Sequence, residues 1–391
     1  MTAFSPQDTT AVSAHSPSDG DRRWDTFLKR RTPPSLEAVS RKHRAGIAGR
    51  RFLVTGAGGW IGSALTQALV QADAQEIILL DAAEGLLHQT AEIIDATSSR
   101  TVSIAVLANV CDTGAIADVF DRHRPEIVFH AAAFKHVPLM ETNPFAAMAN
   151  NAVGTWTLAD TARRRGCQRM VMLSTDKAVE PFSVMGASKR IAELAMLTPR
   201  AGSMQTSAVR LGNVLGSSGS VVPLFLRQIA RGGPVTVTHP DVRRYFMTLT
   251  EAVDALLSTI SPTSPNGLLV PDPGALVRIL DLAQHLIAHE QRPGSPEIPI
   301  VFTSLRPGDK MEESLVSTQE TCAEGQPGLL RTVISHVPDE TRLEAAMRRL
   351  QQAIAERDLH LLLAAVQSLV PEYQPSSLIQ AQLTQAATVG A

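Results

Sequence analysis

The stretch RFLVTGAGGWIGSALTQALV (residues 51–70) decides the fold. Its first five residues form a short apolar run that leads directly into glycines, and residues 61–70 then repeat apolar side chains at helical spacing. A second apolar run, EIILLD (76–81), follows and ends in an acid. Strand, glycine loop, helix and strand in this order predict a βαβ unit with two parallel strands.

The glycines of this loop, Gly56, Gly59 and Gly62, are spaced G-x-x-G-x-x-G. The first permits a tight turn, the second lets backbone N–H groups approach a pyrophosphate, and the third lets the helix pack closely. Asp81 follows Gly62 at the distance expected for a carboxylate that binds ribose hydroxyls. The residues after Asp81 are alanines, with no arginine for a 2′-phosphate, so the pattern favours NAD over NADP. The alternative is an ordinary glycine-rich turn with a capping aspartate. The predicted cofactor contacts here are Gly56, Ala57, Gly59, Trp60, Ile61, Gly62 and Asp81, with the Trp60 ring expected to pack under the sheet.

Further short apolar runs continue the alternation of strands and helices. They are TVSIAVL (101–107), EIVFHAA (126–132), RMVML (169–173) and TSAVRL (206–211). Continuous apolar strands separated by crossover-length segments predict an α/β fold with a doubly wound parallel sheet and a smaller C-terminal lobe. The expected organisation is a mostly disordered extension over 1–45 with a possible docking stretch at 33–39, a dinucleotide-binding domain over 46–215, a partly interleaved substrate-binding lobe over 216–335, and a helical tail over 336–391.

The composition of the 391 residues excludes several functions. A net charge of −2 and an aromatic content of 4% argue against nucleic-acid binding. No run approaches the roughly 20 apolar residues of a membrane span. Cys111, Cys167 and Cys322 are too widely spaced to suggest a disulfide framework or a metal site. We therefore expect a cytoplasmic protein without a transmembrane segment.

Several longer stretches resemble one known family. They include HAAAFKHVPLMETNP (130–144), STDKAVEP (174–181), MGASKR (185–190), VRLGNVLGSSGSVVPLF (209–225) and LRPGDK (305–310). Over about residues 30–330 the chain is similar to CapD-like polysaccharide-biosynthesis proteins, nucleotide-sugar 4,6-dehydratases of the extended short-chain dehydrogenase/reductase superfamily with a Rossmann fold. The resemblance implies a tightly held NAD, a UDP-sugar substrate, usually UDP-N-acetylglucosamine, and a homo-oligomer. Many members carry an N-terminal membrane region, and this chain resembles their soluble catalytic part.

The resemblance also implies catalytic roles for the STDK segment. Asp176 would be the acid at C6, Lys177 the base at C5, and Thr175 a hydrogen-bonding partner near the C4 oxygen. A lysine acts as a base only when its pKa falls, and we expect the charges of Lys189 and the cofactor to lower it. Met185 stands where most of the superfamily has the tyrosine of Tyr-x-x-x-Lys. Methionine cannot transfer a proton, which leaves Thr175 or Asp176 as the base at C4 and predicts a packing role for Met185.

The remaining cofactor contacts implied are at the adenine and along the alanines after the fourth strand. Lys189 would keep a ribose contact, and Lys135 would contact the cofactor or the sugar. The adenine residues are Asn109 and Val110, and the alanines are Ala131 and Ala132.

On the substrate side, Asn213, Arg244 and Arg306 lie in motifs that border the substrate in this superfamily. Arginine suits a diphosphate because its planar fork donates parallel hydrogen bonds. Asn151 is expected to anchor a helix and His136 to be structural. The adjacent Glu312 and Glu313 are expected to be solvated.

Two other functions remain open. A UDP-sugar 4-epimerase would need the oxidation at C4 but no base at C5, and the replacement of tyrosine by Met185 counts against it. A dinucleotide-binding regulatory protein without turnover is the second alternative.

Overall fold

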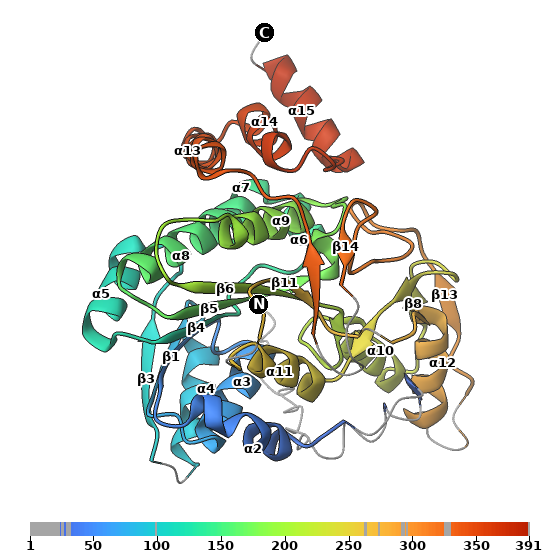
Figure 1. Ribbon diagram of the computed structural model, residues 1–391. Coiled ribbons are helices and arrows are strands. Elements are labelled where there is room, and N and C mark those ends of the chain that lie inside the picture. The colour runs from blue at the N-terminus through green and yellow to red at the C-terminus, as the bar shows by residue number, and fades with distance from the viewer. Residues whose placement is uncertain are drawn as a thin grey trace, which may run out of the picture.

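The computed structural model describes residues 24, 27–28, 33–97, 100–261, 264–272, 274–290, 294, 296–323 and 330–389. A nine-stranded sheet runs through it in the order β14-β15-β11-β6-β5-β4-β1-β2-β3 (Figure 1). The strands from β3 to β11 are parallel, and β15 and β14 are antiparallel additions at one edge. The order of the first six strands is that of the doubly wound Rossmann fold, as predicted.

The order in which the strands are added reverses at β1, because β2 lies on one side of it and β4 on the other. This reversal opens a crevice at the carboxyl ends of the strands, where such sheets bind ligands. The elements of the first half of the sheet are β1 (Arg51–Thr55), α3 (Trp60–Gln71), β2 (Glu76–Asp81), α4 (Glu84–Asp95), β3 (Val102–Leu107), α5 (Thr113–His123) and β4 (Ile127–His130).

The second half continues with longer helical connections. One of them includes a π-helical turn, η1, a feature often found at functional sites. The elements are α6 (Val137–Glu141), α7 (Pro144–Ala147), η1 (Met148–Val153), α8 (Gly154–Arg164), β5 (Arg169–Thr175), the 3₁₀ turn η2 (Asp176–Ala178), α9 (Val184–Leu197) and β6 (Gln205–Leu211).

The core has one layer on each face of the sheet. Alternate residues of each strand point to opposite faces, so Phe52 and Val54 pack with α3 while Leu53 packs with α5 and α8. The α2 and α11 helices complete the first layer, and α9 completes the second (Figure 1). Burial on both faces is why these strands read as continuous apolar runs.

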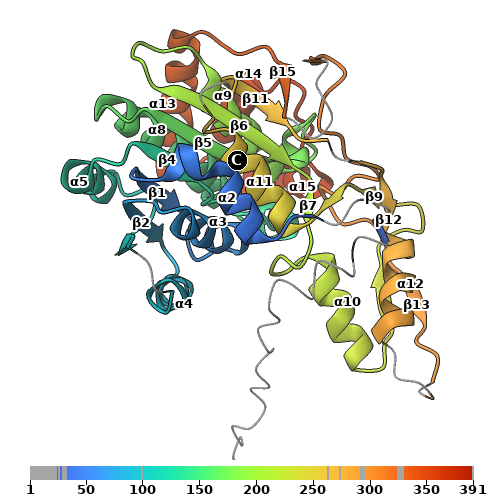
Figure 2. The ribbon, with the colours of Figure 1, turned by 60° about the horizontal axis from the view of Figure 1, so that its bottom comes forward.

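A smaller lobe stands at the carboxyl side of the sheet (Figure 2). Three short strand pairs and two helices build it around their own apolar cluster. Between β10 and β12 of this lobe, the chain passes back to the main sheet through α11 (Leu249–Ser258) and β11 (Gly267–Val270). The elements of the lobe are β7 (Asn213–Val214), α10 (Val221–Ala230), β8 (Val235–Val237), β9 (Arg243–Arg244), β10 (Phe246–Met247), β12 (Val277–Arg278), α12 (Ile279–Glu290) and β13 (Ile300–Phe302).

The N-terminal segment is more ordered than its composition suggests. The helix α2 (Leu36–Ile47) begins at the Ser35 cap and buries Val39 and Ile47 completely against the sheet layer that holds α3 and α11. The sequence predicts a mostly disordered segment over 1–45 with a possible docking stretch at 33–39, and α2 is ordered there because its apolar face finds a packing surface. Trp24 also packs, in the cluster of the smaller lobe. Residues 1–23, 25–26 and 29–32 lie outside the described residues.

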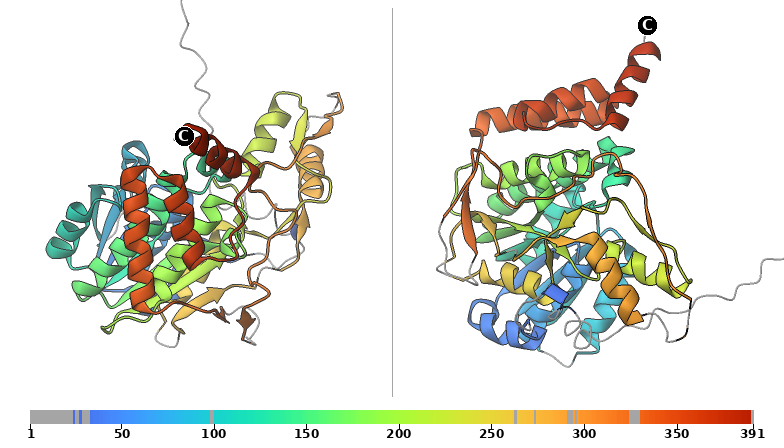
Figure 3. Two further views of the ribbon diagram at one scale, coloured as in Figure 1. Left: turned by 90° about the horizontal axis from the view of Figure 1, so that it is seen from above. Right: turned by 90° about the vertical axis from the view of Figure 1, so that its right-hand side faces the viewer.

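The C-terminal segment forms α13 (Glu340–Glu356), α14 (Leu359–Leu369) and α15 (Ser377–Val389), after β14 (Thr321–Cys322) and β15 (Arg331–Ile334). The α13–α14 hairpin lies across the outer side of α9 (Figure 3), where Leu343, Leu350 and Val366 are buried with Met185 and Ile191. A second, separate core thus covers α9 from outside. None of the helices described here has both the length and the apolar character that a membrane crossing requires.

Candidate active site

The glycine loop after β1 has the geometry that the sequence predicts. Gly56 has a φ of 68°, and a Cβ there would lie 2.6 Å from the backbone nitrogen of Ala132. A Cβ on Gly62 would lie 2.0 Å from the Gly56 carbonyl oxygen. Gly59 is the N-cap of α3 and has no side chain to cap the first turn. The loop is therefore a close-packed backbone cradle at a helix N-terminus, which fits the pyrophosphate of a dinucleotide.

Trp60 does not pack under the sheet as predicted. Its side chain is 44% exposed, and the indole N–H donates a hydrogen bond of 3.1 Å to the Leu215 carbonyl. The ring also lies against Gly216, where a Cβ would be 3.0 Å from it. The first residue of α3 thus links the glycine loop to the start of the smaller lobe. The indole turns outward because the neighbouring sheet face is already filled by α3 and α11.

Asp81 lies beside the glycine loop, at the end of β2. Its Oδ2 accepts the Gly58 N–H at 2.9 Å, and its Oδ1 accepts the Ala83 N–H at the same distance. Both contacts hold the carboxylate at the edge where a ribose would lie in the predicted cofactor site. They also use lone pairs locally, so its contact with a ribose remains a prediction.

The other predicted cofactor contacts gather around the same crevice. The Ala131–Ala132 backbone lies directly against Gly56. Val110 is buried, while the exposed Asn109 accepts the Cys111 N–H through Oδ1 at 2.8 Å and forms a local turn. An adenine contact by Asn109 stays a prediction.

Thr175, Asp176 and Lys177 meet where β5 passes into η2. Asp176 is fully buried, and its Oδ1 accepts hydrogen bonds from Thr175 Oγ1 at 2.9 Å and from Lys177 Nζ at 2.8 Å. Its Oδ2 has no hydrogen-bond partner among the described residues. The three side chains predicted to act together are thus in direct contact, with one carboxylate oxygen uncommitted.

Lys177 also reaches residues from the C-terminal half of the chain. Its Nζ donates to Asn213 Oδ1 at 3.2 Å and lies 3.9 Å from Glu313 Oε1. The predicted substrate residue Asn213 therefore joins the cluster. Glu313 is buried, so its expected solvation is wrong. The sequence offered one weak signal, the proximity of Glu313 to the LRPGDK motif.

The charge state of Lys177 differs from the expectation. Burial disfavours its ammonium form, but the carboxylates of Asp176 and Glu313 outweigh burial and raise the pKa of Lys177. Lys189 was expected to lower it. Instead the Lys189 amine donates to the Leu173 carbonyl at 2.6 Å, and burial lowers the pKa of Lys189 to about 8. These carboxylates therefore favour the ammonium form of Lys177.

Met185 packs as predicted. It is 3% exposed and belongs to the apolar cluster between α9 and the α13–α14 hairpin. The neighbouring Gly186 has a different task, because a Cβ there would lie 2.2 Å from the Lys177 carbonyl oxygen. The start of α9 can therefore touch η2 only with glycine at this position. Asn151 is the predicted anchor, since it donates to Ser188 Oγ and to the Phe134 carbonyl, each at 2.9 Å.

The arginines predicted to bind a diphosphate have different surroundings. Arg244 is buried and donates three hydrogen bonds to the carbonyls of Arg243, Lys310 and Met311. Arg244 thus holds the backbone of residues 310–311, just before Glu313, in place. The Arg306 side chain is 59% exposed and pairs with Asp309 at 2.9 Å.

Positive side chains gather around His136. Lys135 and Arg306 both act on His136, whose pKa is lowered by burial and by these two charges. The His136 ring lies over Gly219, where a Cβ would be 2.3 Å from it. These charges suit an anionic ligand, although no described contact assigns one to Lys135.

A buried charge network behind the site was not predicted. Glu193 of α9 is fully buried and accepts hydrogen bonds from Ser174 Oγ at 2.6 Å, from Arg210 Nε at 2.8 Å and from Arg190 at 3.0 Å. Arg210 in turn pairs with Glu320 at 2.7 Å. Despite its burial, Glu193 has its pKa lowered to about 2 by these partners, chiefly Arg210. The network fixes the end of β5 immediately before Thr175.

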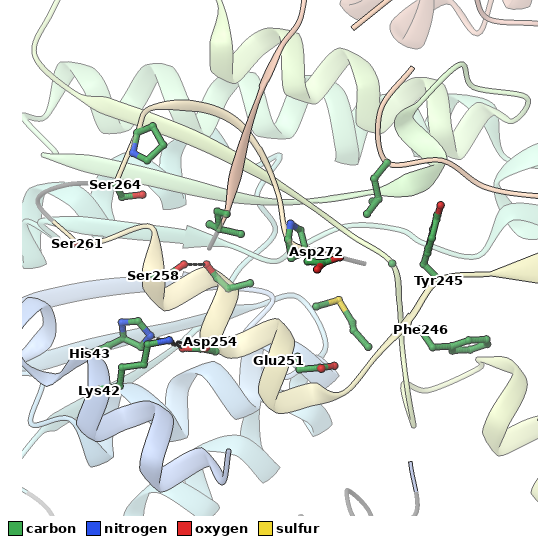
Figure 4. Close-up of a pocket in the computed structure, with 17 residues that line it drawn as sticks. Lys42, His43, Tyr245, Phe246, Glu251, Asp254, Ser258, Ser261, Ser264 and Asp272 are labelled. Atoms are coloured by element: carbon green, nitrogen blue, oxygen red, sulfur yellow. Dashed lines mark hydrogen bonds and ion pairs between the residues drawn. The ribbon is translucent and has the colours of Figure 1, made fainter. Parts of the chain in front are cut away.

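A cavity of about 490 Å³ lies elsewhere, between α2, α11 and the chain after β11 (Figure 4). Lys42 and His43 both contact Asp254 in its wall. Gly212 and Tyr245, next in sequence to Asn213 and Arg244, also line it. The catalytic candidates Asp176 and Lys177 are not among its lining residues.

Comparison with known proteins finds relatives in polysaccharide biosynthesis. Residues 52–328 match the family model described as polysaccharide biosynthesis protein. The chain is 42% identical over 296 residues to the probable polysaccharide biosynthesis protein EpsC of Bacillus subtilis, covering 75% of this chain and 49% of that protein. It is 43% identical over 277 residues to the capsular polysaccharide biosynthesis protein CapD of Staphylococcus aureus, covering 70% and 46%. The chain spans about half the length of these relatives.

Solved structures share the fold at lower identity. Pen from Bacillus thuringiensis is 24% identical with a TM-score of 0.65, covering 75% of this chain and 90% of that one. The dTDP-glucose 4,6-dehydratase DesIV from Streptomyces venezuelae, solved with NAD bound, is 21% identical with a TM-score of 0.58, covering 68% and 87%. The match of the family model over most of the chain, and the two relatives above 40% identity, agree with the sheet order and the glycine loop. The chain belongs to the polysaccharide biosynthesis protein family.

Proposed function

We propose that this chain is an NAD-dependent nucleotide-sugar 4,6-dehydratase that converts UDP-N-acetylglucosamine, or a related UDP-hexose, to a UDP-4-keto-6-deoxy sugar. The observation that carries the proposal is the contact between Asp176 and Lys177 at the carboxyl end of β5, with Lys177 Nζ 2.8 Å from Asp176 Oδ1. Dehydration needs an acid and a base on neighbouring sugar carbons. The residue pair supplies both.

The cofactor part of the proposal depends on the glycine loop. Gly56 and Gly62 let the loop backbone pack closely, since a Cβ at either position would clash with neighbouring backbone, and Asp81 lies beside the loop. These residues, with Lys189 behind the site, would hold NAD. The nicotinamide of a bound NAD supplies the hydride acceptor and donor that the reaction needs, with no net consumption.

The residues divide the proton transfers between them. Asp176, with its uncommitted Oδ2, takes the proton of the C4 hydroxyl, with Thr175 Oγ1 held beside it. The same carboxyl group then protonates the C6 hydroxyl, which leaves as water. Lys177 removes the C5 proton, its ammonium group exchanges with solvent, and it delivers a proton to C5 after the hydride has reached C6. The sugar loses one molecule of water, and both side chains end as they began.

Lys177 is expected to act from its neutral form. Because Asp176 and Glu313 raise its pKa, removal of the C5 proton should accelerate with rising pH.

Proton NMR of the purified chain with UDP-N-acetylglucosamine in D₂O tests the proposal. A new C6 methyl signal with deuterium at C5 is the expected result. Lys177→Ala should abolish C5 exchange, and Asp176→Asn should abolish methyl formation. Arg243→Gln, which alters an exposed side chain paired with Glu312, is the matched control and should behave as wild type.

A UDP-sugar 4-epimerase is the second candidate. It is favoured by relatives described as UDP-glucose 4-epimerase, 36% identical over 203 residues in Rickettsia rickettsii. In the same experiment an epimerase would change only the configuration at C4, with no methyl signal and no C5 exchange. A protein that retains NAD and leaves these UDP-sugars unchanged would instead fit the regulatory alternative.

A further inference from the structure

Glu313 is a buried carboxylate that the proton transfers above do not use. Its side chain is 3% exposed, although it lies between an exposed glutamate and a serine in the sequence. Its Oε2 has no hydrogen-bond partner among the described residues. Burying a carboxylate without hydrogen bonds is costly unless charge partners compensate. The partners of Glu313 therefore indicate why the chain keeps it there.

Two lysines lie next to the carboxyl group of Glu313. Lys177 Nζ lies 3.9 Å from Oε1, and Lys310 Nζ lies 3.7 Å from Oε2. Lys310 is itself fixed, because it donates to the Val179 carbonyl at 2.6 Å. Glu313 is thus held on one side by an anchored lysine and faces the catalytic candidate Lys177 on the other.

The ammonium group of Lys177 has a matching set of neighbours. It donates to Asp176 Oδ1 at 2.8 Å and to Asn213 Oδ1 at 3.2 Å. An ammonium group has three N–H donors, and these two bonds leave one for the direction of Glu313. The lysine is surrounded by one carboxylate from η2, one amide from β7 and one carboxylate from the segment after LRPGDK.

The charged groups that face Glu313 come from every element around it. Burial raises the pKa of Glu313, Lys177 lowers it, Asp176 raises it, and Arg244 and Lys310 lower it. Lys177 in turn is faced by Asp176, Glu313 and Arg244. Glu313 and Asp176 are the two carboxyl groups of this set, and each has one oxygen without a hydrogen-bond partner among the described residues.

We propose that Glu313 is a positioning residue that acts through Lys177: its carboxylate holds the lysine amine between Asp176 and Asn213 and sets the pH above which that amine can take up a proton. The proposal rests on the proposed function, since it assigns Lys177 the removal of the C5 proton.

The substitution Glu313→Gln separates charge from shape. It keeps the size of the side chain and removes a negative neighbour that stabilises the ammonium form. The pKa of Lys177 should therefore fall, and the rising limb of C5 exchange against pH should move to lower pH by about one pH unit. Glu313→Asp retains the charge, so its limb should stay near that of wild type even where its maximal rate falls.

Glu312→Gln is the matched control. Glu312 precedes Glu313, is 52% exposed and pairs with Arg243 at 3.5 Å. The same chemical change at this position should leave the limb unmoved. Circular dichroism of the three variants identifies any that fails to fold, and Glu313→Ala, which also removes the negative charge, takes the place of Glu313→Gln if that variant does not fold.

Two readouts on the full chain test the proposal. One is C5 deuterium exchange of UDP-N-acetylglucosamine, followed by NMR across the neutral and alkaline range. The other is the ¹⁵N resonance of the Lys177 amine, assigned by its loss in Lys177→Ala and titrated without substrate. A downward movement in Glu313→Gln alone supports the proposal. In Glu313→Gln, a loss of rate with no movement of the pH limb or of the Lys177 titration overturns the proposal. A merely structural role would leave both midpoints in place.

The two readouts also separate this proposal from the proposed function. If wild-type protein forms no methyl signal and exchanges no C5 proton, the proposed function fails. The Lys177 titration then still decides whether Glu313 controls the protonation of this amine.

Discussion

The substitution Glu193→Gln is expected to destabilise the fold markedly while keeping the shape of the side chain. Glu193 is fully buried and accepts hydrogen bonds from Ser174, Arg190 and Arg210. An amide in its place removes the negative charge that Arg210 faces inside the protein and presents N–H groups to donors. The change therefore leaves a buried guanidinium with Glu320 as its remaining carboxylate partner.

The magnitude follows from the protonation of Glu193. Its partners lower the pKa of this carboxyl from 4.5 to about 2, which corresponds to a stabilisation of about 3 kcal/mol at neutral pH. Removing one member of a buried ion pair costs about 3–5 kcal/mol in other proteins. We expect a loss near 3 kcal/mol, because Glu320 still compensates Arg210. A lowered carboxyl pKa contributes its stability above the unfolded value and loses it as the pH falls from about 4.5 toward 2.

Urea denaturation of the full chain, followed by circular dichroism, measures this effect. Glu92→Gln is the control, since Glu92 and its partner His88 are each 66% exposed and such pairs contribute little. At acidic pH the difference in the free energy of unfolding between wild type and Glu193→Gln should become smaller. If the free energies of unfolding of Glu193→Gln and Glu92→Gln differ by less than about 1 kcal/mol at neutral pH, the buried network does not stabilise the fold in the way its geometry indicates.

Three further substitutions test other parts of the molecule. Gly62→Ala places a Cβ 2.0 Å from the Gly56 carbonyl oxygen and should weaken NADH binding, measured by fluorescence titration, at least about tenfold. Gly85→Ala, where a Cβ meets nothing within 4 Å, is the control. Equal NADH affinities of the two variants would contradict the prediction. Trp60→Phe removes the indole donor to the Leu215 carbonyl and should lower the free energy of unfolding by about 1 kcal/mol, as measured in urea; an unchanged midpoint would show that the bond contributes nothing. Met185→Tyr should lower stability by about 1–3 kcal/mol and give no increase in turnover, because the site is 3% exposed and packed; a rise in kcat would show that the hydroxyl reaches the sugar.

The framework of the fold was predictable because it depends on local and repetitive signals. Continuous apolar runs identified the parallel strands, and the spacing of Gly56, Gly59 and Gly62 identified the loop between the first strand and its helix. The helical tail was also predicted from its spacing. The order of α2 was not, since its stability depends on a surface formed by α3 and α11, far away in the sequence.

The site was predictable only where its residues are close together in sequence or share a motif. Thr175, Asp176 and Lys177 are consecutive, and their mutual contacts follow from the turn after β5. Glu313 was missed because a carboxylate between polar residues has the sequence pattern of a solvated one. Glu313 contacts Lys177, which is far away in the sequence, and Lys310, three residues before it. The carboxylates of Asp176 and Glu313 reversed the expected shift of the Lys177 pKa.

The α13–α14 hairpin has a consequence for how this protein can be divided. The family model ends at residue 328, before either helix begins. A fragment cut at that boundary would leave bare the side of α9 that carries Met185, Ile191 and Leu194, which the hairpin now covers. Exposed apolar patches of this kind promote aggregation. A fragment that keeps this side of α9 covered must therefore extend beyond the residues that the family model matches, and its C-terminal boundary belongs after α14.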